Sequence, residues 1–178
     1  MSGKLGTESG EAAPLPTRRQ GPTRHAPRAA PPMVVRSPYD EEAMREELKT
    51  IRKHVARLPG LLLATRDGLV LAGDTSDVEN DSVAAMAAAS VGLAAQFTAQ
   101  ARVGEPKAAM FEGENGYVCV FPVETPLLLV VFGEPDMTMG LFNVAAKQAL
   151  SLLQQALVRQ RMHSVTGSAA GVLRLGGG

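Results

Sequence analysis

The stretch from Ser82 to Ala101 carries no charged residue over 20 positions, and it constrains the fold more than any other part of the chain. Its apolar and small side chains recur at helical spacing, which predicts a helix from about 79 to 102. Almost no charged face remains on this helix, so more than one of its sides must be covered. One cover can be the chain's own sheet, and a second copy of the chain is an economical source of the other.

A membrane-spanning helix is the alternative for an uncharged stretch of this length. Alanine dominates the stretch and Ser, Thr and Gln recur in it, whereas insertion favours Leu, Ile and Phe. We therefore expect no membrane span. No apolar run follows the N-terminus, so we expect no signal peptide. The single cysteine, Cys119, cannot form an internal disulfide and favours a reducing, cytoplasmic location.

Composition divides the chain into three segments. Residues 1–37 are rich in Pro and Arg and lack apolar periodicity, which predicts a disordered basic tail. Residues 38–163 are expected to form one domain, and the Gly-, Ala- and Ser-rich residues 164–178 a flexible tail. Residues 1–38 hold six basic and two acidic residues, whereas 39–163 hold eleven basic and sixteen acidic ones. The acidic body lacks the clustered Lys and Arg of a nucleic-acid surface, so we expect no nucleic-acid partner.

The remaining pattern gives the order α-β-β-α-β-β-β-α, an α/β (α+β) class. A helix beginning at Ser37-Pro38 precedes two apolar runs around Asp67-Gly68, which predict a hairpin. Strands are expected at 107–112, 117–123 and 127–132, and a last helix from about 138 to 162. The two later strands are apolar on both faces and should be central, whereas the polar 107–112 strand should lie at an edge.

Three segments, taken together and in order, resemble the roadblock (dynein light-chain) domain family over residues 37–162. The first is the run LPGLLLATRDGLVLA at 58–72, which resembles the family's helix end and Asp-Gly hairpin. The second is the Ala-rich opening AAMAA at 84–88. The third is the strand pair from Tyr117 to Phe132, which leads to Met139-Gly140-Leu141 at the last helix.

The resemblance implies a three-layer roadblock fold. Its five-stranded, mostly antiparallel sheet would have the strand order second–first–fifth–fourth–third, with the second helix on one face and the first and third on the other. It also implies a homodimer in which the second helix and the edge strand meet their counterparts. The residues expected at that dimer interface are Val83, Ala85, Met86, Ala89, Gly92, Leu93, Gln96, Ala99, Lys107, Ala109 and Phe111.

The resemblance further implies a non-catalytic regulator or scaffold. Bacterial members act beside small Ras-like GTPases as partners or activators, and some actinobacterial members sit in sets with a sensor histidine kinase. The Ala-, Arg-, Gly- and Pro-rich composition is typical of a high-GC bacterium. A small-ligand sensor of similar three-layer architecture is the alternative, and it would need a cavity with a few polar groups.

No pattern indicates catalysis, a metal or a cofactor. The phosphate loop of a GTPase is absent, and His25, His54 and His163 are not spaced as metal ligands. Cys119 lies in an apolar strand, where its thiol should be protonated and inert. Asp67 is interpreted as a turn residue, and its neighbour Arg66 as a candidate contact for a partner protein. Met86 and Phe97 are interpreted as core or dimer packing.

Overall fold

The computed structural model describes residues 39–124 and 126–172, with side chains through Met162. The predicted order of three helices and five strands is confirmed. The predicted disordered tail, 1–37, lies outside the described residues. In chain order the elements are α1 (Glu41–His54), β1 (Gly60–Thr65), β2 (Val70–Asp74), α2 (Asn80–Ala101), β3 (Ala109–Gly113), β4 (Gly116–Glu124), β5 (Leu127–Gly133) and α3 (Met139–Val172).

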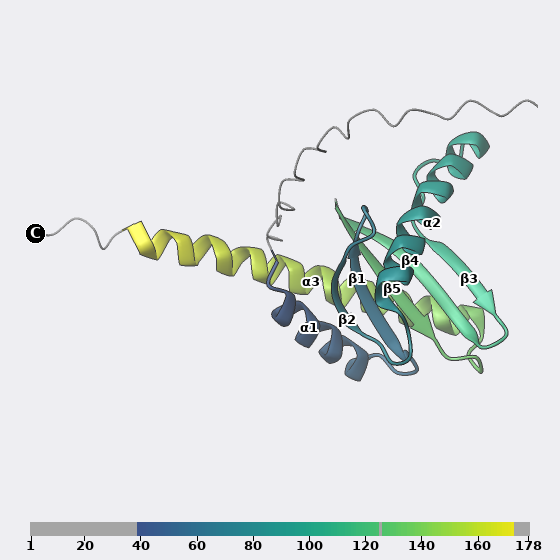
Figure 1. Cartoon of the computed structure of the whole chain (residues 1–178), viewed down its shortest axis with the longest axis horizontal. Helices are drawn as coiled ribbons and strands as arrows, with labels where there is room; N and C mark the ends of the chain where they lie inside the picture. The colour runs from purple at the N-terminus through teal and green to yellow at the C-terminus, as the bar shows by residue number, and fades with distance from the viewer. Residues whose placement is uncertain (1–38, 125, 173–178) are drawn as a thin grey trace, which may run out of the picture. The chain divides into compact units, whose positions relative to one another are not determined.

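The five strands form one antiparallel sheet in the order β2-β1-β5-β4-β3. This is the strand order that the resemblance implies. Strand β5 lies between β1 and β4, with Leu63 opposite Leu129 on one side and Val120 opposite Val130 on the other. Strands β2 and β3 are the two edges, as Figure 1 shows for β3 at the right of the sheet.

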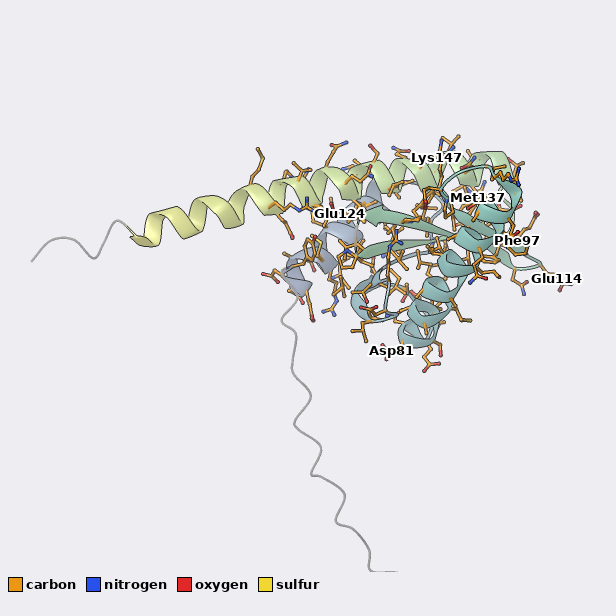
Figure 2. The ribbon with its side chains drawn as sticks, turned by 90° about the horizontal axis from the view of Figure 1, so that it is seen from above. Asp81, Phe97, Glu114, Glu124, Met137 and Lys147 are labelled. Atoms are coloured by element: carbon orange, nitrogen blue, oxygen red, sulfur yellow. The ribbon has the colours of Figure 1, made fainter. Side chains whose placement is uncertain are left out.

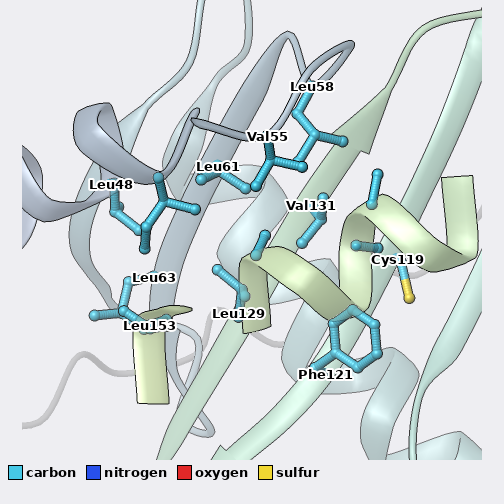
Figure 3. Close-up of a cluster of buried hydrophobic side chains, with 14 of the residues drawn as sticks. Leu48, Val55, Leu58, Leu61, Leu63, Cys119, Phe121, Leu129, Val131 and Leu153 are labelled. Carbon is cyan, nitrogen blue, oxygen red and sulfur yellow. The ribbon is translucent and has the colours of Figure 1, made fainter. Parts of the chain in front are cut away.

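Alternate residues of the central strands enter two separate cores. Leu61 and Leu63 pack with α1 and α3 on one face, whereas Leu62 and Ala64 pack with α2 on the other. Successive side chains of a strand point to opposite faces, so strands buried on both faces lack the usual apolar–polar alternation. Figure 3 shows part of the larger core, where Leu48, Val55 and Leu153 meet the sheet. The predicted three layers are confirmed.

The start of α3 fits closely against the end of β5. A Cβ atom added to Gly133 would lie 2.4 Å from Cδ2 of Phe142, which is fully buried. Phe142 stacks on Tyr117 with ring centroids 5.1 Å apart. Glycine at 133 is therefore what lets this aromatic pair lie against the sheet.

Helix α3 is longer than the sequence predicted. We expected it to end at about Met162 and residues 164–178 to be a flexible tail, but the helix continues through Val172. The prediction rested on the Gly-, Ala- and Ser-rich composition, but residues 163–172 contain no Pro, and Gly167 and Gly171 weaken a helix without removing its hydrogen bonds. Residues 173–178 lie outside the described part of the chain.

Candidate functional site

Helix α2 packs on the sheet through small side chains. Its buried residues are Ala84, Ala87 and Val91, which recur at helical spacing and contact the core that Val120 and Val130 supply from the sheet. A helix face of small residues allows close approach to the strands beneath it. The larger side chains of α2 consequently lie on its flanks.

Those larger side chains are exposed. Met86, Leu93 and Phe97 are 62%, 54% and 68% exposed, and they follow one another along the side of α2. Phe111 on the neighbouring edge strand β3 is 51% exposed. We call the exposed residues of α2 together with β3 the α2–β3 surface. Figure 2 shows Phe97 near the end of α2, with Asp81 at the helix start and Glu114 beside the β3–β4 turn.

An apolar groove of about 640 Å³ runs between α2 and the sheet within this surface. Among the described residues that line it, the one polar side chain is that of Ser90, whose hydroxyl donates to the carbonyl of Ala87 at 2.8 Å. The groove therefore offers no converging polar groups from these residues to orient a small molecule. Its apolar lining residues on the strands are Ala109, Met110, Phe111, Val118, Val120, Val130 and Phe132.

The β1–β2 turn lies against the first half of α2. Gly68 has φ of +81°, and a Cβ atom there would lie 3.1 Å from Cα of Ala85. Arg66 is exposed at this turn, and its backbone N–H donates to the carbonyl of Pro126 at 2.8 Å. Leu69 lies just before β2 and is 65% exposed. The turn thus carries an arginine and a leucine beside α2.

The predicted interface stays a prediction, with one correction to its residues. All eleven are exposed or half-buried in the single chain, which an interface between copies requires. Lys107 is not in the edge strand, because β3 begins at Ala109. Met86 and Phe97 were interpreted as core or dimer packing; both side chains are exposed, which excludes the core and leaves dimer packing as a prediction. The groove was not predicted from the sequence, because hydrophobic periodicity does not show how much of a sheet a helix covers.

The described residues bring together no catalytic or metal-binding set. No group of three or more His, Cys, Asp or Glu side chains is placed to hold a metal among them. Cys119 is fully buried, and burial raises the pKa of its thiol to about 12, so the thiol is protonated. His54 is exposed and donates through Nδ1 to the carbonyl of Thr50 at 2.7 Å. His25 and the side chain of His163 lie outside the described residues.

By length and composition alone, α2 is also the one described helix able to cross a membrane. This is weak evidence, because core helices of water-soluble proteins meet the same criterion. Here one side of α2 contacts the sheet through Ala84, Ala87 and Val91. The absence of a membrane span stays a prediction.

Comparison with known proteins yields one family and several solved folds. Residues 46–132 match the model of the Roadblock/LC7 domain. No curated protein matches the chain. Among solved structures, Myxococcus xanthus MglB is similar with a TM-score of 0.60 and 16% identity, over 71% of this chain and 96% of that one.

Two further solved structures agree with this result. A Roadblock/LC7 domain from Streptomyces avermitilis has a TM-score of 0.55 at 16% identity and covers 64% of this chain and 97% of its own. The gliding protein MglB from Thermus thermophilus has a TM-score of 0.53 at 24% identity and covers 66% and 92%. At these identities the structures show a shared fold. The match at residues 46–132 places a Roadblock/LC7 domain in this chain, and the solved structures share its fold.

Proposed function

We propose that this protein is a non-catalytic, homodimeric regulator or scaffold that binds a small Ras-like GTPase. The observation that carries the proposal is the exposed apolar α2–β3 surface, in which Met86, Leu93, Phe97 and Phe111 surround an apolar groove. Contiguous apolar surface of this kind, rimmed by polar residues, marks protein–protein contact sites. The Roadblock/LC7 domain supplies the expected class of partner.

Two features of this surface support the proposed dimer. Strand β3 is an edge strand, and an edge presents unpaired N–H and C=O groups that a second strand can satisfy. Beside it, α2 presents large apolar side chains that a second α2 can cover. A two-fold axis near Phe111 would pair the two β3 strands and the two α2 helices at once, because the same surface of each copy then contacts the other copy.

Light scattering on the purified full chain tests this dimer. We expect twice the mass of one chain at micromolar concentration. A Phe97→Glu variant should give the mass of one chain, because two carboxylates would enter an apolar contact. The matched control is Val144→Glu, at an exposed apolar residue of α3 on the other side of the sheet, which should stay dimeric. Wild-type protein that remains monomeric on concentration would contradict the dimer.

The partner contact is proposed to include the β1–β2 turn. Arg66 and Leu69 combine a charge and an exposed apolar side chain next to α2, which suits contact with another protein. The test is a pull-down with a Ras-like GTPase encoded near this protein, loaded with GTP or GDP. We expect binding that weakens in Arg66→Ala but not in Lys53→Ala, an exposed control on α1. No binding in either nucleotide state would refute this partner.

Further parts of the proposal extend from the family resemblance. We infer a cytoplasmic location and association with a sensor histidine kinase assembly, without nucleic acid, membrane span, metal or cofactor. Co-purification of the three proteins from the native cell tests the assembly. A small-ligand sensor is the second candidate, and the volume of the groove is its support. Strong thermal stabilisation by one metabolite, with no dimer, would favour the sensor.

A further inference from the structure

The charges of α2 lie at its two ends. Asp81 in the first turn and Arg102 at the end of the helix are both exposed, and residues 82–101 between them carry no charge. Glu79, immediately before the helix, adds a second exposed carboxylate at its start. Figure 2 shows Asp81 at one end of α2 and Phe97 near the other. The helix is therefore acidic at its start, basic at its end and uncharged between them.

Arg102 adopts a backbone conformation that favours glycine. Its φ is +55°, in the left-handed region. Its backbone N–H donates to the carbonyl of Ala99 at 3.1 Å, and the N–H of Val103 donates to the carbonyl of Thr98, also at 3.1 Å. These two bonds form the Schellman motif that commonly ends a helix, with glycine as the usual left-handed residue because it has no Cβ. An arginine at this position strains the backbone, and a contact made by its side chain would offset that strain.

The described part of the domain does not supply such a contact. Within residues 39–124 and 126–162, the side chain of Arg102 forms no ion pair or hydrogen bond, and neither does that of Asp81. The dipole of α2 favours a positive charge near its C-terminus. This accounts for the sign of the charge but not for its position, because a basic residue in the last turn, which has none, would meet the dipole without strain. The guanidinium of Arg102 is thus available to a carboxylate of another molecule.

The side of α2 that borders the apolar groove is complementary to itself. Four of its residues line the groove at intervals of four, three and four positions: Met86, Ser90, Leu93 and Phe97. Side chains at this spacing form the contact between two packed helices. In an antiparallel pair centred midway along this run, Met86 lies level with Phe97 of the second copy, and the small Ser90 lies level with Leu93. A parallel pair would instead set Phe97 against Phe97 and Ser90 against Ser90, which leaves a gap beside a crowded position.

The same register brings the charged ends of α2 together. Asp81 and Arg102 lie equally far from the centre of the run, so each Arg102 is level with Asp81 of the second copy. Glu79 lies about 3 Å further along the helix direction, within reach of the same long side chain. Opposite charges attract at this spacing, whereas a parallel pair would place arginine beside arginine and carboxylate beside carboxylate. Charge therefore favours a second copy in antiparallel orientation as the occupant of this surface.

We propose that Arg102 determines the specificity of self-association, and that its guanidinium binds the carboxylates of Asp81 and Glu79 at the start of α2 in a second copy. This inference rests on the dimer proposed above and names the charged pair that selects the partner. A two-fold dimer contains the pair twice, once at each end of the paired helices. Charged pairs at the edge of an apolar contact mainly exclude wrong partners. A protein with a similar apolar surface but no acidic helix start should therefore bind α2 poorly.

Replacing Arg102 by glycine separates the contact from the strain. Glycine relieves the left-handed backbone, so the single chain, measured in the Phe97→Glu background, should need at least as much urea to unfold as before. The dissociation constant of the otherwise wild-type dimer should nevertheless rise roughly tenfold, about threefold for each of two exposed pairs. Sedimentation equilibrium at low and high salt measures this constant, and the effect should shrink at high salt.

The matched control is Lys147→Ala, at an exposed basic residue of α3, which should leave the dissociation constant unchanged. An Arg102→Gly dimer with the same dissociation constant as this control at low salt would overturn the proposal.

Exchange of the charges tests the partner of Arg102. Arg102→Glu and Asp81→Arg each place like charges at both ends of the paired helices, so each variant alone should dimerise more weakly than wild type. In a mixture of the two variants, a heterodimer has opposite charges at both ends and should form in preference to either homodimer. Native mass spectrometry of the mixture measures this preference, and a heterodimer also shows that both variants fold. A statistical mixture of homodimers and heterodimer would contradict the pairing.

Failure of this inference differs from failure of the proposed dimer. If wild-type protein is dimeric and Phe97→Glu monomeric, while the Arg102 variants dimerise like wild type, the α2–β3 dimer stands and the ion pair is wrong. If wild-type protein stays monomeric on concentration, the proposed dimer is itself wrong, and the ion pair is wrong as well.

Discussion

Replacing Phe97 by alanine should separate dimerisation from folding. The side chain is 68% exposed in the single chain and contributes little to the core. A phenylalanine side chain offers about 200 Å² of surface, so roughly 130 Å² of Phe97 is available for burial by a second copy. At about 25 cal/mol per Å², this burial is worth about 3 kcal/mol per copy.

Alanine retains part of that surface, so the truncation removes about 2 kcal/mol per copy. A two-fold interface contains the residue twice, so the substitution removes about 4 kcal/mol of binding free energy. The dissociation constant of the dimer should therefore rise roughly 1,000-fold. The free energy of unfolding of the single chain should change by less than about 0.5 kcal/mol, because an exposed side chain is lost.

Sedimentation equilibrium across a dilution series measures the dissociation constant, and urea unfolding measures the stability of the domain. Val144→Ala is the control, since Val144 is 65% exposed on α3, on the other face of the sheet. Its dissociation constant should equal that of wild type. If the dissociation constant of Phe97→Ala is within about threefold of the wild-type value, a change of under 1 kcal/mol in binding free energy, Phe97 is not in the interface.

Three further predictions concern the domain itself. Gly133→Ala should destabilise it by about 1–3 kcal/mol in urea unfolding, because the added Cβ lies 2.4 Å from Phe142; Gly140→Ala, with open space around its Cβ, should not. Cys119 should react with a thiol reagent only after unfolding. Because its folded pKa of about 12 is raised from an ordinary value near 9, unfolding by urea should become easier as pH rises above about 9. Arg159→Ala should cost under about 1 kcal/mol of domain stability by thermal unfolding, since its pair with Glu47 is solvent-exposed.

The sheet could be predicted because its sequence signals agree with one another. Leu127 to Val131 are apolar at every position, which indicates burial on both faces and therefore a central strand. Asp67-Gly68 specifies the turn between the first two strands, and Gly68 adopts the positive φ that such a turn needs. These features predict the strands and the turn, whereas the complete strand order was implied by the family resemblance.

The orientation of α2 could not be predicted, because nearly every side of this helix is apolar. Hydrophobic periodicity locates the buried face of a helix only when another face is polar. The structure resolves the choice by close packing, with Ala84, Ala87 and Val91 inward and Phe97 outward. The end of α3 was placed too early because the Gly-, Ala- and Ser-rich residues after Met162 were interpreted as a tail, whereas Gly167 and Gly171 weaken a helix without removing its hydrogen bonds.

The orientation of α2 is itself evidence about what surrounds the domain. If α2 only covered its own sheet, burial of Met86, Leu93 and Phe97 would stabilise the domain most. Burial of a larger apolar side chain contributes more free energy than burial of alanine. The structure instead exposes these three residues beside an apolar groove of about 640 Å³, although the sheet beneath still offers Val118 and Phe132 to a covering layer. A partner that covers this surface gains the free energy of burying it. A second copy of the chain would cover α2 and the edge strand at the same time. We therefore propose self-association at this surface before any other partner.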